Sequence, residues 1–367
     1  MKLSEFNYDL PKDLIAQTPI EPRDESRLMI VDKNNQQIED KIFKDILNYL
    51  WENDVIVINK TRVINARLKW KIESNNWKHM ECEIFLHKQI SDNTWDCLIY
   101  PWKKLKPWTK IDFDLSIPSN IEIWLEWEPW KEKKWGLDIN LKANIKQISS
   151  SWRIVEFNIW WKEFLDIIDN IGQIPLPPYI KEKLENKERY QTVFNEVSWS
   201  VAAPTAWLHF TDELIEKLEK SGVIIEKVLL HVWIWTFTWV EVDDIKEHKM
   251  HSEYIEIDKE VSDRLNKFKK EKKRIIAVWT TSVRTLESFS NENWILWYWK
   301  KETDIFIYPG YKWRFVNSII TNFHLPKSTL LMLVSSFTSR EKIKKAYNHA
   351  ISKKYRFFSF WDAMWIK

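Results

Sequence analysis

The stretch RIIAVWTTSVRTLES (274–288) decides the fold. Residues 274–278 are apolar and largely β-branched, which is typical of a buried strand, and a helix is predicted from Ser282 onward. The same alternation continues on both sides. Strands are predicted at 54–59, 223–230 and 304–307, and helices at 41–50, 163–170, 211–221, 259–270, 327–337 and 340–353. This order predicts layers of helices on a sheet, an α/β architecture.

Residues 66–157 differ from the rest of the chain. Short β-like runs recur there about every 8–12 residues, separated by lysine, proline and asparagine, as in a small sandwich or barrel. These runs are ECEIFLH, DCLIY, KIDF, IEIWLE, LDINL and RIVEF. The sequence therefore predicts a multidomain α+β protein: an α/β catalytic domain from 1–65 and 158–367, with an inserted all-β barrel at 66–157.

Composition narrows the class of protein. The chain has 367 residues, a net charge of +3 and 44% hydrophobic residues, which indicates a globular protein with a sizeable core. No apolar run reaches the roughly 18–20 residues of a membrane span, and the N-terminus has no signal-peptide pattern. The two cysteines, Cys82 and Cys97, do not form a disulfide framework and are expected to face the barrel core. A cytoplasmic location without membrane contact is expected.

Two residue types have abnormal counts. The chain has 25 tryptophans and 4 glycines, whereas a usual glycine share of about 7% predicts roughly 26 glycines in this length. Tryptophan also stands where glycine turns are expected, as at Trp102 and Trp108 beside prolines. Our hypothesis is that UGA codons meaning glycine in the source are written here as tryptophan. The alternative is a truly tryptophan-rich protein that makes its turns almost without glycine.

Five segments concentrate polar residues in apolar surroundings. They are SVAAPTAWLHFT (200–211), LHVWIWTF (230–237), EHKMHSE (247–253), VWTTSVRTLES (278–288) and the pair TDIFIYPGY and TNFHLPKSTLLMLVSSF within 303–337. Five of the eight histidines fall in these segments: His209, His231, His248, His251 and His324. A lone histidine is more often a hydrogen-bonded structural residue than a catalyst, but their concentration in these segments favours an acid–base role for the group.

With these motifs the chain resembles the S-adenosylmethionine:tRNA ribosyltransferase-isomerases of the queuosine pathway. The resemblance runs from YDLPKDLIAQTPIEPRDESRL (8–28) through NKTRVINARL (59–68) and PLPPYI to YRFFSFWDAM (355–364). That family has glycine where this chain has Trp199, Trp207, Trp233, Trp235, Trp279 and Trp361. One departure is Lys60, where the family usually has aspartate, so position 60 is not assigned a catalytic role.

The resemblance implies the reaction and its partners. The ribosyl part of S-adenosylmethionine, a co-substrate, moves onto 7-aminomethyl-7-deazaguanine at the wobble position of a tRNA with a GUN anticodon. It rearranges to epoxyqueuosine while adenine and methionine leave. No metal is expected, and a monomer is expected. Basic clusters at 103–106, 131–134, 267–274 and 340–345 are solvated faces or, if they share one face, a track for tRNA phosphates.

Such steps need groups that titrate near neutral pH, so His209, His231 and His251 are the predicted catalytic residues. Arg284 is predicted to bind the methionine carboxylate bidentately, or alternatively to pair with Glu287 at i,i+3 on a solvated face. Thr280, Thr281 and Ser282 either bind an anion or cap a helix. The other predicted substrate-binding residues are Arg62, Thr205, Asn322, His324, Lys327, Ser328 and Thr329.

Two other functions remain open at this point. A methyltransferase would also use S-adenosylmethionine, but no glycine-rich loop follows a first strand, even with tryptophan read as glycine. A non-catalytic RNA-binding protein could be built on the β-rich insert. A metal site at His248 and His251 is disfavoured because no HExxH or CxxC motif accompanies them.

Overall fold

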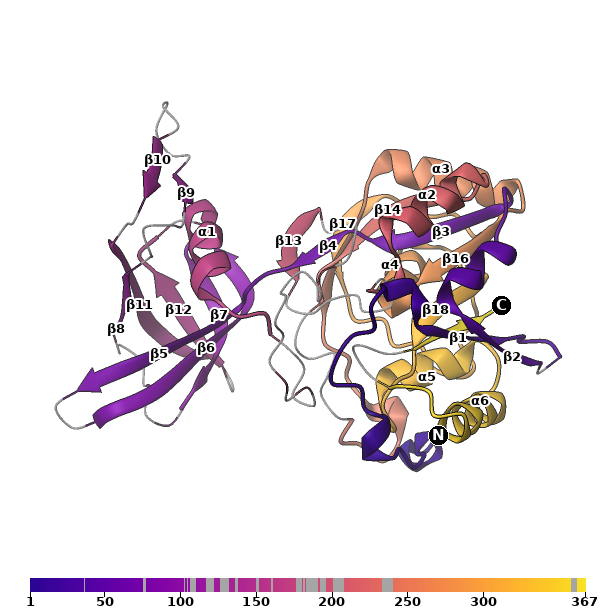
Figure 1. Cartoon of the computed structure of the whole chain (residues 1–367), viewed down its shortest axis with the longest axis horizontal. Helices are drawn as coiled ribbons and strands as arrows, with labels where there is room; N and C mark the ends of the chain where they lie inside the picture. Colours follow the sequence, from indigo (N-terminus) through magenta and orange to yellow (C-terminus); the bar gives the residue numbers. More distant parts are fainter. Residues whose placement is uncertain are drawn as a thin grey trace. The chain divides into compact units, whose positions relative to one another are not determined.

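The chain divides into two compact units in the computed structural model (Figure 1). Unit 1 comprises Met1–Arg62 and Leu176–Lys367, and unit 2 comprises Val63–Pro175. The structure describes residues 1–35, 37–74, 77–101, 103, 105, 110–116, 122–125, 132–135, 138–149, 152–159, 161–175, 180, 182, 191, 196–200, 208–232, 240–357 and 362–367.

Unit 1 is built on a nine-stranded sheet of order β17-β15-β14-β3-β16-β18-β19-β1-β2. Its centre is parallel: β14, β3, β16 and β18 run in the same direction. The strands are β1 (Arg27–Val31), β2 (Ile38–Ile42), β3 (Asp54–Asn59), β14 (Ile224–Leu230), β15 (Glu253–Ile257), β16 (Arg274–Val278), β17 (Trp299–Thr303), β18 (Ser318–Asn322) and β19 (Ala363–Ile366). All six residues of β3 are buried, as expected for a parallel strand covered on both faces.

The helices of unit 1 follow the strands in the alternation that the sequence predicts. They are α2 (Asp212–Lys220), α3 (Lys259–Lys270), α4 (Trp279–Phe289), α5 (Thr329–Ser336) and α6 (Arg340–Ser352), with 3-10 helices at Leu3–Phe6, Lys12–Leu14, Arg23–Glu25, Phe43–Asn48 and Ile245–Glu247. Helix α4 packs against β3, β14, β16 and β18, and nearly all of its side chains are buried. A buried helix rich in polar residues is unusual, and those residues require partners in the interior.

The ends of the helices use local hydrogen bonds that the sequence indicates. Thr211, Ser328 and Ser339 each accept a hydrogen bond from the backbone N–H three residues ahead, which satisfies a free donor of the first turn. After α2, Gly222 adopts a φ of +86°, a conformation that glycine takes without strain. These contacts explain why α2 begins and ends where the sequence predicts.

Unit 2 contains a six-stranded antiparallel sheet of order β5-β6-β7-β12-β11-β8 and a separate β9–β10 hairpin. Its elements are β5 (Arg67–Ser74), β6 (Trp77–Ser91), β7 (Thr94–Tyr100), β8 (Lys110–Ser116), β9 (Glu122–Leu125), β10 (Glu132–Trp135), β11 (Asp138–Ser149), β12 (Trp152–Phe157) and α1 (Trp161–Ile171). Cys82 and Cys97 are both buried in this unit. In its described strands the series runs openly from β5 to β8, without a pairing that closes it into a barrel. A short pair of strands, β4 (Thr61–Val63) and β13 (Val197–Ser200), forms a sheet of its own.

The predicted fold class, an α/β protein with an inserted β-rich unit, is confirmed. Several local predictions need correction. The strand predicted at 304–307 lies earlier, at β17, α4 begins at Trp279 instead of Ser282, and the helix predicted at 41–50 is a 3-10 helix preceded by β2. Unit 2 extends to Pro175 and so includes α1, whereas the predicted boundary at 157/158 places α1 with the α/β domain.

Two tryptophans have a backbone conformation that bulky residues rarely adopt. Trp279 has a φ of +71° and Trp294 a φ of +59°. A side chain in this left-handed region costs roughly 1–2 kcal/mol, and glycine avoids that cost. Both positions therefore favour the interpretation that glycine belongs there.

Candidate active site

The polar groups of unit 1 gather where its central parallel strands end. Asn59 ends β3, Asn322 ends β18, His231 follows β14, and Trp279 follows β16. In open parallel sheets, ligands bind beyond the carboxyl ends of the strands. The fold therefore places the segments selected from the sequence at the edge where a site is expected.

The first cluster joins the ends of β3 and β14 to α4. The Asn59 amide donates to Oγ1 of Thr281 at 3.3 Å, and its oxygen accepts from the Thr61 N–H at 3.3 Å. Oγ1 of Thr61 lies 3.2 Å from Nδ1 of His231, whose ring stacks on Tyr254 with centroids 5.4 Å apart. Burial lowers the pKa of His231 to about 4, so this ring is neutral at pH 7.

The second cluster is built around His209. Its Nδ1 lies 2.8 Å from Oγ of Ser26, its Nε2 lies 3.2 Å from Nδ2 of Asn322, and its ring packs on Phe43. Burial, together with the charges of Arg356 and Arg23, lowers the pKa of His209 to about 3. Both ring nitrogens are thus engaged inside the protein, which is the arrangement of a structural histidine.

His324 is held in a third buried network. Its Nε2 lies 2.9 Å from Oγ1 of Thr321, its N–H donates to the Tyr347 hydroxyl at 2.8 Å, and its carbonyl accepts from the Tyr8 hydroxyl at 2.5 Å. Burial lowers its pKa to about 3. These contacts tie the turn before α5 to the N-terminal segment and to α6.

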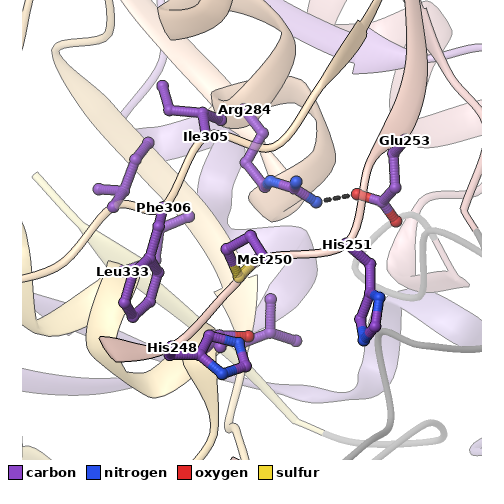
Figure 2. A pocket seen from close by; sticks show the side chains of 11 residues that line it. His248, Met250, His251, Glu253, Arg284, Ile305, Phe306 and Leu333 are labelled. Carbon is purple, nitrogen blue, oxygen red and sulfur yellow. Dashed lines mark hydrogen bonds and ion pairs between the residues drawn. The ribbon is translucent and has the colours of Figure 1, made fainter. Parts of the chain in front are cut away.

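A pocket that is open to solvent lies on unit 1 (Figure 2). Arg284 of α4 and Glu253 of β15 form an ion pair in it, with His248, Met250 and His251 on the segment before β15. Figure 2 shows Phe306 and Leu333 on the side opposite His251 and Glu253. The described residues that line it are His248, Met250, His251, Glu253, Arg284, Ile305, Phe306, Ile307, Thr329, Leu330 and Leu333.

The charges in the pocket suit acid–base chemistry beside a fixed cation. Burial lowers the pKa of Arg284 to about 10, partly offset by the charge of Asp304, so the guanidinium stays protonated at neutral pH. Burial also lowers the pKa of His248 and of His251, and the charge of His251 lowers that of His248 further. Both rings are therefore mainly neutral at pH 7 and able to accept a proton.

One alternative for Arg284 is wrong. Arg284 and Glu287 do not pair on a solvated face, because both are buried, at 6% and 0% exposure. Glu287 instead accepts hydrogen bonds from the backbone N–H groups of Arg314, Phe315 and Val316 and from the Tyr311 hydroxyl. Its carboxylate therefore fixes the loop before β18 while Arg284 faces the pocket.

The structure brings only some of the predicted site residues together. His251, Arg284 and Thr329 line the pocket. Thr281 and His231 belong to the first cluster, and Asn322 and His209 to the second. Ser328 caps α5, Lys327 donates its N–H to the Phe6 carbonyl, and Thr280, Ser282 and Arg62 do not line the pocket. Thr205 lies outside the described residues.

Sequence reasoning did not assign roles to several pocket residues. Glu253 and Met250 lie within the segment EHKMHSE, which was singled out only for its histidines. Phe306 and Leu333 resemble core residues by their pattern, and only the fold shows that they border a pocket. Among the described residues, no cluster of three or more His, Cys, Asp or Glu side chains is suited to a metal ion. No helix in the described part of the chain has the length and apolarity to cross a bilayer.

Comparisons with known proteins match this chain to one family over nearly its whole length. The profile of the family described as queuosine biosynthesis protein matches residues 3–366. Two relatives named S-adenosylmethionine:tRNA ribosyltransferase-isomerase are 48% identical (Acetivibrio thermocellus) and 45% identical (Clostridium kluyveri) over 368 residues, covering 100% of each chain. The crystal structure of the S-adenosylmethionine tRNA ribosyltransferase of Thermotoga maritima is 34% identical, with a TM-score of 0.53 over 99% of this chain and 100% of that one.

Proposed function

Since the chain belongs to the queuosine biosynthesis protein family, we propose that it is an S-adenosylmethionine:tRNA ribosyltransferase-isomerase. It transfers the ribosyl part of S-adenosylmethionine to 7-aminomethyl-7-deazaguanine at the tRNA wobble position and rearranges it to the epoxycyclopentane of epoxyqueuosine. Adenine and methionine are released. The observation that carries this proposal is the match over the whole length of relatives with that name.

The proposed reaction sets three demands on the protein. The sulfonium acidifies the neighbouring 5′ carbon, so a base must remove a proton there. An acid must assist the departure of adenine, and the amine of the nucleobase must be neutral to attack the sugar. Such transfers proceed best with groups that titrate near the working pH.

The pocket on unit 1 is a suitable place for this chemistry. We propose that it takes S-adenosylmethionine, with His251 as a group that exchanges protons with the substrate and His248 beside it. The ring of His231 stacks on Tyr254, which follows the pocket residue Glu253 in the chain. His231 therefore lies close to the same region. His209 is proposed to hold the sheet edge in place through Asn322, because both of its ring nitrogens are engaged.

The proposed partner is a tRNA with a GUN anticodon, bound by a monomer in the cytoplasm. Its target base must leave the anticodon-loop stack to reach a pocket. The remaining predicted contacts are also proposed as substrate-binding residues: Arg62, Thr205, Thr280, Thr281, Ser282, Asn322, His324, Lys327 and Ser328. S-adenosylmethionine serves as co-substrate, and the mechanism needs no metal.

One experiment separates this proposal from its rivals. The protein is mixed with S-adenosylmethionine labelled in the adenine ring and with tRNA carrying 7-aminomethyl-7-deazaguanine. Release of free adenine, with the label absent from S-adenosylhomocysteine, supports the transferase-isomerase. Formation of S-adenosylhomocysteine would instead identify a methyltransferase, and tRNA binding without turnover would identify a non-catalytic RNA-binding protein.

A further inference from the structure

The guanidinium of Arg284 is held along only one of its edges. Nη1 donates to Glu253, whereas Nε and Nη2 have no hydrogen-bond partner among the described residues. The side chain is only 6% exposed, and it lines the pocket. Buried charged donors are costly unless an acceptor satisfies them, so this edge is suited to a ligand. Figure 2 shows the ion pair with Glu253 at the same end of the pocket as Ile305.

Other arginines of this chain show what the Nε and Nη2 edge binds. Three of them donate from both nitrogens to the two oxygens of one carboxylate, with N–O distances between 2.6 and 2.9 Å. The pairs are Arg67–Glu83, Arg264–Glu226 and Arg274–Asp54. A planar carboxylate matches these two parallel donors, and Arg284, which lines the pocket, has the same two donors buried and without a partner among the described residues.

The charges around Arg284 indicate which kind of anion fits. Glu253 contacts the guanidinium, and the charge of Asp304 also acts on it. The guanidinium is thus already paired with one carboxylate and lies in the field of a second, which disfavours a phosphate with its higher negative charge. A zwitterion suits this field better, because its carboxylate meets Arg284 while its ammonium group is attracted to the acidic residues.

The rest of the pocket suits a flexible aliphatic chain. Met250, Ile305, Phe306, Leu330 and Leu333 supply apolar surface next to the guanidinium. Such a lining favours methylene groups and sulfur, while the buried guanidinium of Arg284 orients the polar end. An amino acid with a thioether or sulfonium side chain combines all these properties.

We propose that Nε and Nη2 of Arg284 bind the α-carboxylate of the methionyl part of S-adenosylmethionine, and that Glu253 positions the guanidinium from its other edge. This inference rests on the proposed function and names the residues of its substrate site. It also means that methionine, the product, occupies the same position before it leaves.

The test compares S-adenosylmethionine with its decarboxylated analogue, which lacks only the carboxylate. Binding of both, and of L-methionine, is measured by calorimetry without tRNA in the wild-type protein and in Arg284→Lys, which keeps the charge opposite Glu253. We expect Arg284→Lys to weaken binding of S-adenosylmethionine about 10- to 100-fold, in line with the loss of one or two charge-assisted hydrogen bonds. The analogue should bind both proteins within about 3-fold.

The matched control is Arg264→Lys, because Arg264 makes the same two-nitrogen contact with Glu226 but does not line the pocket. It should leave both affinities unchanged. Equal weakening of both ligands in Arg284→Lys, or no weakening of either, would overturn the assignment. Thermal unfolding of each variant confirms that folded protein is compared.

Glu253→Gln tests the positioning role separately. It should raise KM for S-adenosylmethionine at least about 5-fold with kcat within about 2-fold, because the groups that perform the chemistry stay in place. An equal loss in kcat would contradict a positioning role. If S-adenosylmethionine binds through Arg284 but no adenine is released with tRNA, the proposed function fails while the carboxylate site stands. If adenine is released normally by Arg284→Lys, the carboxylate site fails while the proposed function stands.

Discussion

The side-chain amide of Asn322 donates to Nε2 of His209 across 3.2 Å. Because an amide nitrogen can only donate, Nε2 must accept, and the proton of the neutral ring is on Nδ1, which donates to Ser26. A ring fixed in one tautomer at both nitrogens has little capacity to exchange protons with a substrate. This relationship separates His209 from the histidines that line the pocket.

The first prediction concerns His209. His209→Ala leaves Ser26 and Asn322 without a partner in the interior and opens a cavity beside Phe43, so the free energy of unfolding should fall by about 2–4 kcal/mol. KM for S-adenosylmethionine of the folded fraction should change less than about 3-fold. Urea unfolding and initial rates of adenine release measure the two effects. Unchanged stability with a 100-fold loss of turnover would instead assign His209 to catalysis.

The second prediction concerns His251. Its ring lines the pocket and has a lowered pKa, so His251→Ala should reduce turnover about 100-fold, the usual scale for a general acid–base group. The acid limb of the pH–rate profile should disappear in this variant, while binding of L-methionine is kept. His349→Ala is the matched control, because His349 pairs with Asp40 and does not line the pocket. Turnover near the wild-type level in His251→Ala would remove this residue from the mechanism.

The third prediction follows from three buried neutral histidines. Folding lowers the pKa of His209, His231 and His324 to about 3, 4 and 3, so between these values and pH 6.5 the unfolded chain binds more protons than the folded one. Stability is therefore constant with respect to these groups above pH 6.5 and falls as the pH is lowered, by up to about 1.4 kcal/mol per pH unit for each ring.

Urea unfolding at pH 7, 6 and 5 measures this slope. His231→Asn removes one titrating ring and should reduce the slope. A stability that does not change between pH 7 and pH 5, or a slope that is the same in His231→Asn, would show that the rings take up protons equally in both states.

The fourth prediction concerns the tryptophans at positive φ. Trp294 is 60% exposed, so Trp294→Gly removes backbone strain with little loss of buried surface and should stabilise the protein by about 1 kcal/mol. Trp297 is 61% exposed but is not among the residues with positive φ, so Trp297→Gly should instead destabilise by about 0.5–1 kcal/mol. The difference between these two variants in urea unfolding isolates the backbone effect. Equal effects would contradict a glycine position at 294.

The same reasoning applies at the site. Trp279, at the start of α4, has a positive φ and is buried at 3% exposure. Replacing it by glycine, together with Trp207→Gly, Trp233→Gly and Trp235→Gly, should raise the soluble yield and the turnover of the enzyme. The last three positions lie outside the described residues. Adenine release by the four-glycine variant, compared with the chain as written, measures the gain. UGG codons at these positions in the gene would refute the recoding hypothesis.

Much of the fold could be predicted because strong local patterns decide it. β3, β16, α2 and α3 have uninterrupted apolar or amphipathic runs with clear ends, and they lie where the sequence places them. β19 and β1 could not be placed in this way. Their pairing joins Leu28 to Ala363, and no local pattern reveals partners so far apart in the chain.

The site could be predicted only in part, because local patterns select candidate residues but do not show which of them come together. The sequence selects polar residues within apolar segments, and this finds Arg284 and His251 as well as the buried His209 and His324. Whether a polar residue faces a pocket or a neighbouring side chain depends on tertiary packing, which the pattern does not contain. Asn322 is an example, because its amide is directed at His209 through contacts between segments over a hundred residues apart.

The position of β19 between β18 and β1 has a consequence for synthesis on the ribosome. β1 leaves the exit tunnel early, but its parallel neighbour is made only with residues 363–366, on the order of 20–60 s later at usual elongation rates. Unit 2, by contrast, is formed by the contiguous segment Val63–Pro175 and has all its strands long before then. Unit 2 can therefore fold before the larger sheet receives its last strand, and chaperone protection of β1 is expected throughout that interval.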